Sequence, residues 1–135
     1  MHTHKTRIRV RYKETDNMGI VYYSNYFVYF EVARTEHFRN LGIEYKELEK
    51  KGIYLVVLEA LCNYILPARY DDILEIRTSF RKNGKSKLQF DYMVFNLSLN
   101  TLSKGKSSAA GYTTHVFVNK NARPIKIPGP IEKFL

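Results

Sequence analysis

The 135-residue sequence contains one cysteine, no tryptophan and no apolar run long enough to cross a membrane. A single cysteine, Cys62, excludes an intramolecular disulfide, and its leucine neighbours place it in an apolar strand as a structural thiol. A membrane-spanning helix needs roughly 20 apolar residues, and the N-terminal residues MHTHKTRIRV lack the apolar segment of a signal peptide. We therefore expect a cytoplasmic protein without a transmembrane segment.

Glycine and histidine are too scattered to form a familiar ligand site. Gly84, Gly105 and Gly111 form no phosphate-binding loop, which argues against nucleotide hydrolysis and redox cofactors. His2 and His4 offer two ligands where a metal site needs three or four. The sequence therefore predicts no cofactor and no metal.

Acidic residues are scarce in the second part of the chain. Residues 1–76 carry eleven Lys or Arg and eleven Asp or Glu, whereas residues 77–135 carry eleven and two, so the net charge of +9 lies in that second part. Such a bias attracts nucleic acid, a membrane surface or a phosphorylated substrate. Neither an RNP-like stretch nor a helix-turn-helix or zinc pattern accompanies it, so nucleic acid is not the expected partner.

Length and hydrophobic periodicity predict one domain, residues 1–135, of the α+β class. At 44% hydrophobic residues the chain has enough apolar surface for one core and too little length for two. The pattern predicts strands over residues 6–12, 53–66, 72–82, 86–96 and 106–118, and helices over residues 24–41 and 45–51.

The helix over residues 24–41 is apolar or aromatic around most of its girth, which predicts a central helix with few faces in water. Ser24 or Asn25 is positioned to cap its first turn with a side-chain oxygen, and Gly42 supplies the permissive backbone that favours a helix end. The near-continuous apolar run over residues 53–66 predicts a strand buried on both faces.

The strands are too long to lie straight in so small a domain. A straight 13-residue strand reaches roughly 43 Å, whereas the radius of gyration is roughly 14 Å. Asn83-Gly84 is a hairpin signal that makes the third and fourth strands antiparallel neighbours. We expect an antiparallel sheet of about five strands wrapped around the central helix. Its uncovered edges favour pairing with a second copy as a homodimer or homotetramer.

Asp16 stands in the turn-prone segment just before the long helix. The first N–H groups of a helix lack intrahelical partners and carry roughly half a positive charge. A thioester oxygen directed at the N–H groups near Tyr23 and Ser24 would be stabilised as its negative charge develops, while Asp16 acts on the carbonyl carbon or on a water. An Asp in this position is more often a helix cap or an Asx turn.

The whole segment TDNMGIVYYSNYFVYFEVARTE resembles the signature of the 4-hydroxybenzoyl-CoA thioesterase family, most closely its YbgC-like branch, in the hotdog superfamily. The resemblance implies the hotdog fold and an acyl-CoA thioesterase that cleaves a thioester to a free acid and CoA. Asp16 maps onto the family's nucleophile or general base. Tyr23 maps onto the residue whose backbone N–H polarises the carbonyl, although YbgC-like members usually have histidine there.

Other positions take substrate-binding roles by the same resemblance. Gly19 maps onto the turn glycine, and Asn25 and Tyr26 map onto the N-Y pair at the helix start. Glu31 matches the helix glutamate, and it is the alternative catalytic carboxylate because some hotdog thioesterases place theirs on this helix. The phosphates of CoA are the expected partners of the positive charge in residues 77–135. The expected contacts are the lysines that flank the predicted hairpin: Lys82, Lys85 and Lys87.

An enzyme is therefore the first hypothesis, and a non-catalytic module that binds acyl-CoA or acyl-carrier protein is the alternative. Both use a basic surface and a preformed cleft. The sequence does not define the acyl group, because the pocket is built across strands and subunits.

Overall fold

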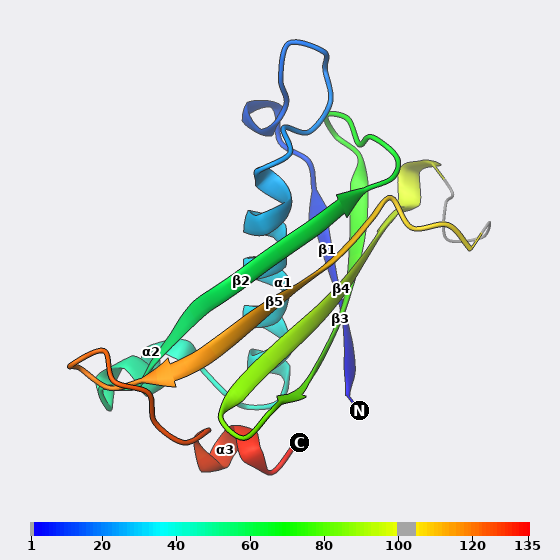
Figure 1. The fold of residues 1–135 in the computed structure, drawn as a ribbon. Helices are drawn as coiled ribbons and strands as arrows, with labels where there is room; N and C mark the ends of the chain where they lie inside the picture. Colours follow the sequence, from blue (N-terminus) through cyan, green and yellow to red (C-terminus); the bar gives the residue numbers. More distant parts are fainter. Residues whose placement is uncertain (1, 100–104) are drawn as a thin grey trace.

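The computed structural model describes residues 2–99 and 105–135. A five-stranded sheet curves around one long helix, α1 (Figure 1). The strands are β1 (Thr3–Arg9), β2 (Tyr54–Tyr64), β3 (Ile73–Asn83), β4 (Lys87–Asn96) and β5 (Ala109–Val118). They lie in the order β1-β3-β4-β5-β2, and every neighbouring pair is antiparallel. The predicted α+β class and wrapped sheet are confirmed.

Alternation within β3 shows why one face of the sheet receives the helix. Leu74, Ile76, Thr78 and Phe80 are buried toward the core, while Glu75, Arg77 and Ser79 alternate with them and point to the opposite face. Residues 83–84 turn the chain into β4, and Gly84 has a positive φ of 83° that an L side chain rarely adopts. The predicted hairpin is therefore confirmed.

Helix α1 (Asn25–Asn40) lies across the concave face of the sheet, and its core-facing side chains are Tyr26, Tyr29, Phe30, Ala33, His37 and Phe38. The ring of Phe30 stacks on that of Tyr92 at a centroid distance of 4.1 Å. The predicted end of this helix is confirmed, since Gly42 follows the last turn with a φ of 83°. The remaining helices are short: η1 (Tyr12–Glu14), α2 (Tyr45–Lys50), η2 (Leu97–Leu99) and α3 (Gly129–Glu132).

The predicted capping of α1 is wrong. Ser24 occupies the N-cap position, but its backbone is helical and its side chain makes no capping hydrogen bond. Asn25 instead donates its side-chain N–H to the carbonyl of Glu14, 2.9 Å away. The side chain therefore ties the helix to the preceding loop and leaves helix N–H groups available.

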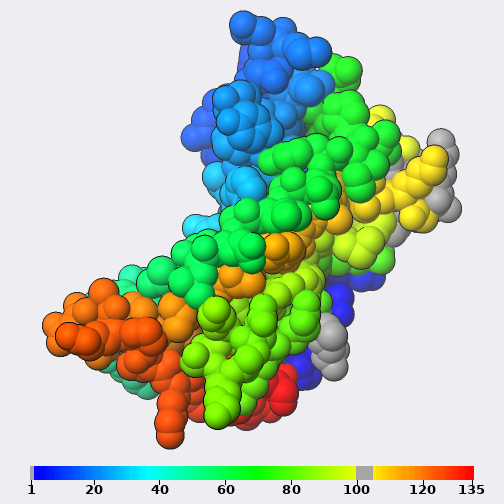
Figure 2. Space-filling view, viewed as in Figure 1, coloured from blue at the N-terminus to red at the C-terminus, as the bar shows by residue number. Residues whose placement is uncertain are grey.

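The predicted two-sided burial of residues 53–66 is also wrong for the single chain. β2 forms one edge of the sheet, and Val57 and Leu58 are 46% and 51% exposed. Figure 2 shows the β2 residues, in green, at the surface with no other segment in front of them. Val28 and Val32 of α1 are exposed as well, so this helix meets water on more of its surface than predicted. Apolar composition alone does not distinguish a central strand from an apolar edge strand.

Within the described residues, no helix is long and apolar enough to cross a membrane.

Candidate active site

Asp16 lies in a tight loop that backbone hydrogen bonds close on both sides. Its N–H donates to the carbonyl of Ile20 and its carbonyl accepts from the N–H of Gly19, both at 2.9 Å. Gly19 has a φ of 78°, which explains glycine at this turn. The Met18 N–H donates to Asp16 Oδ1 at 2.8 Å. In the described part of the chain Oδ2 has no hydrogen bond, so one carboxylate oxygen is held and the other is free to react.

A buried glutamate, Glu14, fastens this loop to the helix. Its carboxylate accepts hydrogen bonds from the backbone N–H and guanidinium of Arg11 and from the hydroxyl of Tyr29 on α1. Its carbonyl accepts from the Tyr22 N–H at 2.8 Å and from the Asn25 side chain at 2.9 Å. Burial acts to raise the pKa of Glu14, but the hydrogen bonds from Arg11 and Tyr29 outweigh it and hold the pKa below its ordinary value.

Two backbone N–H groups are unoccupied where α1 begins. In the described residues, neither the Tyr23 N–H nor the Ser24 N–H donates a hydrogen bond, whereas the Tyr26 N–H donates to the Tyr23 carbonyl. The Tyr64 hydroxyl donates to the same carbonyl at 3.0 Å. Burial, with a smaller contribution from Cys62, raises the pKa of Tyr64 to about 12, so this donor keeps its proton. The peptide units at the start of α1 are thus held in place, and the N–H groups of Tyr23 and Ser24 are left available as donors.

The cleft that contains Asp16 has a volume of about 440 Å³ and is called the Asp16 cleft below. Its other lining residues are mostly aromatic or aliphatic: Ile20, Val21, Tyr22, Tyr23, Tyr26, Tyr64, Ile65, Leu66 and Pro67. The rings of Tyr23 and Tyr26 both contact that of Tyr64 edge to face. An apolar wall beside a carboxylate and free N–H groups suits an acyl group whose carbonyl is to be attacked.

Asp16 also lines a second hollow on another side of the loop. This hollow has a volume of about 620 Å³ and is bordered by Tyr12, Thr15, Asp16, Asn17, Gly19 and Tyr70. We call it the Tyr12–Tyr70 hollow. The same carboxylate therefore borders two spaces of different chemical character.

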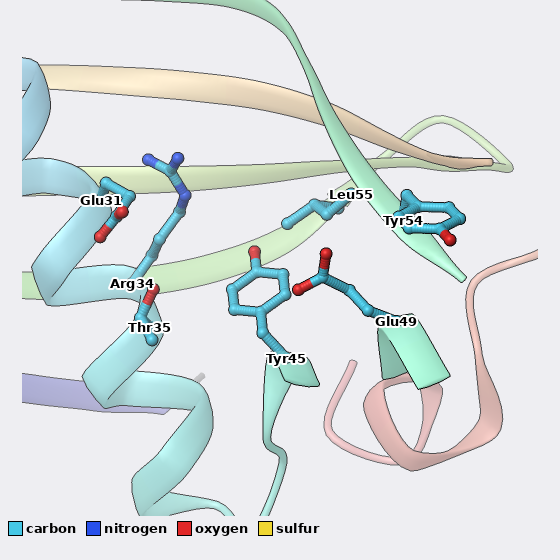
Figure 3. Close-up of a pocket in the computed structure, with 7 residues that line it drawn as sticks. All are labelled: Glu31, Arg34, Thr35, Tyr45, Glu49, Tyr54 and Leu55. Atoms are coloured by element: carbon cyan, nitrogen blue, oxygen red, sulfur yellow. The ribbon is translucent and has the colours of Figure 1, made fainter. Parts of the chain in front are cut away.

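Glu31 is not brought to Asp16 within one chain. It lines a separate pocket of about 370 Å³, the Arg34 pocket, with Arg34, Thr35, Tyr45, Glu49, Tyr54 and Leu55. Figure 3 shows Glu31 and Arg34 extending from α1, with the side chains of Tyr45 and Glu49 pointing into the same space from α2. Tyr54 and Leu55 place this pocket at the start of β2, whereas the Asp16 cleft lies at the end of β2.

The predicted lysine contacts also lie away from Asp16 in this chain. Lys82, Lys85 and Lys87 flank the β3–β4 hairpin, at the end of the sheet opposite the Asp16 loop (Figure 1). Lys82 forms an ion pair with Glu132 of α3 at 2.6 Å. The structure thus brings together Asp16, Tyr23, Tyr26 and the Asn25 anchor, and separates them from Glu31 and the lysines.

Similarity to known proteins identifies the family of this chain. Residues 10–135 match the thioesterase-like superfamily. The chain belongs to this superfamily. The predicted recognition, fold and enzyme class, a hydrolase acting on thioester bonds, are therefore confirmed.

Several thioesterases are similar to this chain over most of its length. The chain is 32% identical over 133 residues to the acyl-CoA thioesterase YbgC of Helicobacter pylori strain 26695, and the alignment covers 96% of this chain and 97% of that protein. It is 36% identical to the acyl-CoA thioester hydrolase YbgC of Escherichia coli O6:H1, over 70% of each chain. The crystal structure of DHNA-CoA thioesterase from Staphylococcus aureus is 31% identical with a TM-score of 0.83, and the alignment covers 93% of this chain and 81% of that one.

Sequence reasoning missed two residues that hold the loop and the helix start of this candidate site in place. Glu14 precedes Asp16 by two positions, and its charge in a segment that becomes buried was the available signal. Tyr64 comes from β2, forty-one positions after Tyr23, whose carbonyl it contacts. No local pattern announces that contact, because the register of β2 against β5 creates it.

Proposed function

We propose that this protein hydrolyses an acyl-CoA thioester to a free acid and CoA, with the Asp16 carboxylate as nucleophile or general base. The observation that carries the proposal is that Asp16 and Tyr23 line one apolar cleft. Within the described residues, one oxygen of the Asp16 carboxylate accepts no hydrogen bond, and the N–H groups of Tyr23 and of Ser24 beside it donate none. The thioesterase names of the relatives support the same reaction.

The N–H groups of Tyr23 and Ser24 are the proposed donors to the thioester oxygen. As the carbonyl carbon becomes tetrahedral, its oxygen gains negative charge, and donors that are already oriented stabilise it without reorganisation. The positive end of α1 adds to this field. Hydrogen bonds to the Tyr23 carbonyl from Tyr64 and from the Tyr26 N–H hold that region in place.

Asp16 supplies the attack in either of two ways. As a nucleophile, Oδ2 adds to the carbonyl carbon, the thiolate leaves, and water then cleaves the acyl-aspartate. As a general base, the carboxylate takes a proton from the water that attacks. A thiolate is a good leaving group, so neither route needs a dedicated proton donor. Tyr23, in place of the histidine of YbgC-like members, is thus proposed to act through its backbone.

Gly19, Asn25 and Tyr26 are proposed to orient the site. Gly19 permits the turn of the Asp16 loop, and Asn25 ties the Glu14 carbonyl to the helix start. Tyr26 is buried and forms part of the cleft wall. These roles, and those of Glu31 and the hairpin lysines, stay predictions.

A homodimer formed through β2 would give the separated residues a place in the site. Antiparallel pairing of two copies of β2 covers both uncovered edges and places the start of this strand in one copy beside its end in the other. The Arg34 pocket with Glu31 then lies near the Asp16 cleft of the second copy. The same reversal brings the lysine hairpin of one copy to the end of the sheet where the other has Asp16.

The alternative function is a module that binds acyl-CoA or acyl-carrier protein without turnover. Release of free thiol from a panel of short aliphatic, long aliphatic and aromatic acyl-CoA esters decides between the two. We expect turnover of at least one class. Saturable binding of CoA with no thiol release above the buffer rate from any ester would support the alternative and contradict hydrolysis.

Isotope labelling tests for one form of the nucleophilic route. If an acyl-aspartate forms and water attacks its aspartate carbon, many turnovers in water enriched in the heavy oxygen isotope label the Asp16 carboxylate, which peptide mass spectrometry locates, and a single turnover releases unlabelled acid. If water attacks the acyl carbon, or if Asp16 acts as a general base, the released acid is labelled and the Asp16 carboxylate is not.

A further inference from the structure

We infer that the Tyr12–Tyr70 hollow binds the phosphorylated, adenosine-bearing arm of coenzyme A, an assignment that rests on the proposed thioesterase function. A thioester carries an acyl group on one side of its carbonyl carbon and the thiol, here CoA, on the other. Both groups need space beside the carboxylate that acts on that carbon. Asp16 borders the apolar Asp16 cleft and the more polar Tyr12–Tyr70 hollow. The acyl arm fits the apolar side, which leaves the hollow for the leaving thiol and its nucleotide.

The two tyrosines present aromatic surface that the fold does not use for its core. Tyr12 is 76% exposed and Tyr70 is 58% exposed, although they come from segments far apart in the sequence. Their ring centroids lie 5.6 Å apart with a tilt of 40°. The rings are too close for a base to insert between them, but both side chains are largely exposed to solvent. An exposed aromatic face of this kind is one on which an adenine ring stacks.

A cation lies beside the same hollow. A Cβ atom placed on Gly19, which lines the hollow, would be 3.7 Å from the Arg69 guanidinium. In the described residues Arg69 has no carboxylate within ion-pair distance, whereas Arg9 and Arg11 nearby are paired with Asp71 and Glu14. A free guanidinium binds phosphate through two parallel hydrogen bonds. Arg69 is therefore the phosphate contact that this surface offers.

The backbone that presents Tyr70 is held in an unusual conformation. Asp71, the next residue, has a positive φ of 72°, which is rare outside glycine. Its N–H donates to the Val10 carbonyl, and its carboxylate pairs with Arg9 at 3.0 Å. These bonds fix the turn that carries both Arg69 and Tyr70. The ring and the cation are thus presented together before any ligand arrives.

The test compares one acyl group on two leaving thiols. CoA carries the phosphates and adenosine, whereas N-acetylcysteamine carries only the reactive end. For wild type, the ratio of kcat/KM for the CoA ester to kcat/KM for the N-acetylcysteamine ester measures what the nucleotide contributes. We expect this ratio to fall about tenfold in Tyr70→Ala and in Arg69→Gln. Arg123→Gln changes another exposed arginine that has no ion pair with a described residue, and it should leave the ratio within twofold of wild type.

Binding of free CoA tests the same assignment without any turnover. We expect calorimetry to show about tenfold weaker CoA binding for Tyr70→Ala and Arg69→Gln than for wild type, and increasing salt should reduce the Arg69→Gln difference. If both variants keep the wild-type ratio and CoA affinity, the inference is wrong. It is also wrong if Lys85→Gln alone lowers them. A protein that binds CoA in this way but releases no thiol would contradict the proposed hydrolysis and leave the subsite supported.

Discussion

Asp16 owes its position to the residue two places before it. Glu14 accepts hydrogen bonds from Arg11 on one side and from Tyr29 of α1 on the other, and its carbonyl holds the Tyr22 N–H and the Asn25 side chain. The carboxylate loop and the helix start are therefore fixed to the same buried group. A displacement of about 1 Å in such a site costs up to about 100-fold in rate.

Glu14→Gln should lower kcat about tenfold, because the amide loses the charge that pairs with Arg11 and the loop shifts relative to α1. KM for the acyl-CoA ester should change less than kcat. The matched control is Glu75→Gln, which also removes a buried carboxylate paired with an arginine, Arg77, but lies on β3. Steady-state kinetics measure kcat and KM of both variants, at equal concentrations of folded protein.

The same variant combined with Asp16→Asn tests whether Glu14 acts through Asp16. The double variant should be no slower than Asp16→Asn alone. Glu14→Gln acts by displacing the Asp16 carboxylate, so it has no further effect once that carboxylate has been removed. Equal losses of kcat in Glu14→Gln and Glu75→Gln, or rate losses that multiply in the double variant, would show that Glu14 only supports the fold.

His37 makes stability depend on pH. Burial, with smaller contributions from His4 and His2, lowers the pKa of His37 to about 4. Between its ordinary pKa of about 6.5 and that value, the unfolded chain binds a proton that the folded chain does not, so the free energy of unfolding falls as pH falls. At about pH 5 the loss from this residue is about 2 kcal/mol.

Urea unfolding of wild type and His37→Gln measures this loss. Between about pH 7 and about pH 5, wild type should lose about 2 kcal/mol more stability than the variant. His115, whose pKa burial lowers to about 3, acts equally in both proteins and cancels in the comparison. Identical losses in the two proteins would contradict the assigned pKa shift of His37.

At the level of elements, Gly111 is where β5, β2 and α1 meet most closely. A Cβ atom there would lie 2.1 Å from the Leu61 carbonyl oxygen and 3.0 Å from the Phe30 ring. Its φ is not positive, so the requirement for glycine is space. Gly111→Ala should lower the free energy of unfolding by about 2–3 kcal/mol by forcing β2 away from β5.

The control for this change is Gly129→Ala, since nothing lies within 4 Å of a Cβ atom at Gly129 and its φ is not positive. Its effect should stay within about 0.5 kcal/mol. Chemical denaturation measures both variants. A Gly111→Ala protein as stable as Gly129→Ala would mean that β2 does not pack against β5 as the structure has it.

Local sequence patterns predicted the helices and strands, and they failed where tertiary contacts determine the structure. Alternation in β3 and the Asn83-Gly84 turn depend on neighbours in sequence, so both were predictable. The expected cap at Ser24 or Asn25 was wrong. Ser24 has a helical backbone and makes no capping hydrogen bond, and the Asn25 side chain binds the Glu14 carbonyl, eleven positions earlier. The exposed edge of β2 was missed because apolar side chains look the same at an edge and in a core.

The candidate site divides in the same way. Asp16, Gly19 and Tyr23 lie within one short segment, and that segment alone placed them together. Tyr64 ends β2 and Tyr70 lies in the turn after it. Their places beside the Asp16 loop depend on tertiary contacts, such as the hydrogen bonds from the Val21 N–H to the Ala68 carbonyl and from the Tyr64 hydroxyl to the Tyr23 carbonyl. Family resemblance named the loop residues but gave no distances, so the separation of Glu31 from Asp16 required the structure.

For the whole molecule, the uncovered β2 edge predicts a homodimer. Leu58 is 51% exposed at an irregularity of β2, where it makes no pair with β5. Leu58→Arg should weaken self-association at least tenfold by burying a charge in the interface. Sedimentation equilibrium measures the effect. Met93→Arg, at an equally exposed apolar position on β4, should leave the dimer intact.

A wild-type protein that sediments as a monomer at micromolar concentration would contradict pairing through β2. Dissociation by Met93→Arg and not by Leu58→Arg would place the interface on the outer face of the sheet instead. Either result would also remove the proposed route by which Glu31 and the hairpin lysines reach the site of a second copy.

The role of the Asp16 carboxylate is tested most directly by comparing Asp16→Asn with Asp91→Asn. Asn keeps the shape of each side chain and removes its charge. Asp91 lies on β4, where it pairs with Arg81, and it lines neither the Asp16 cleft nor the Tyr12–Tyr70 hollow. Thiol release from the most active acyl-CoA ester should fall by about 100-fold or more in Asp16→Asn and stay within about threefold in Asp91→Asn. Equal turnover by wild type and Asp16→Asn would contradict catalysis by Asp16.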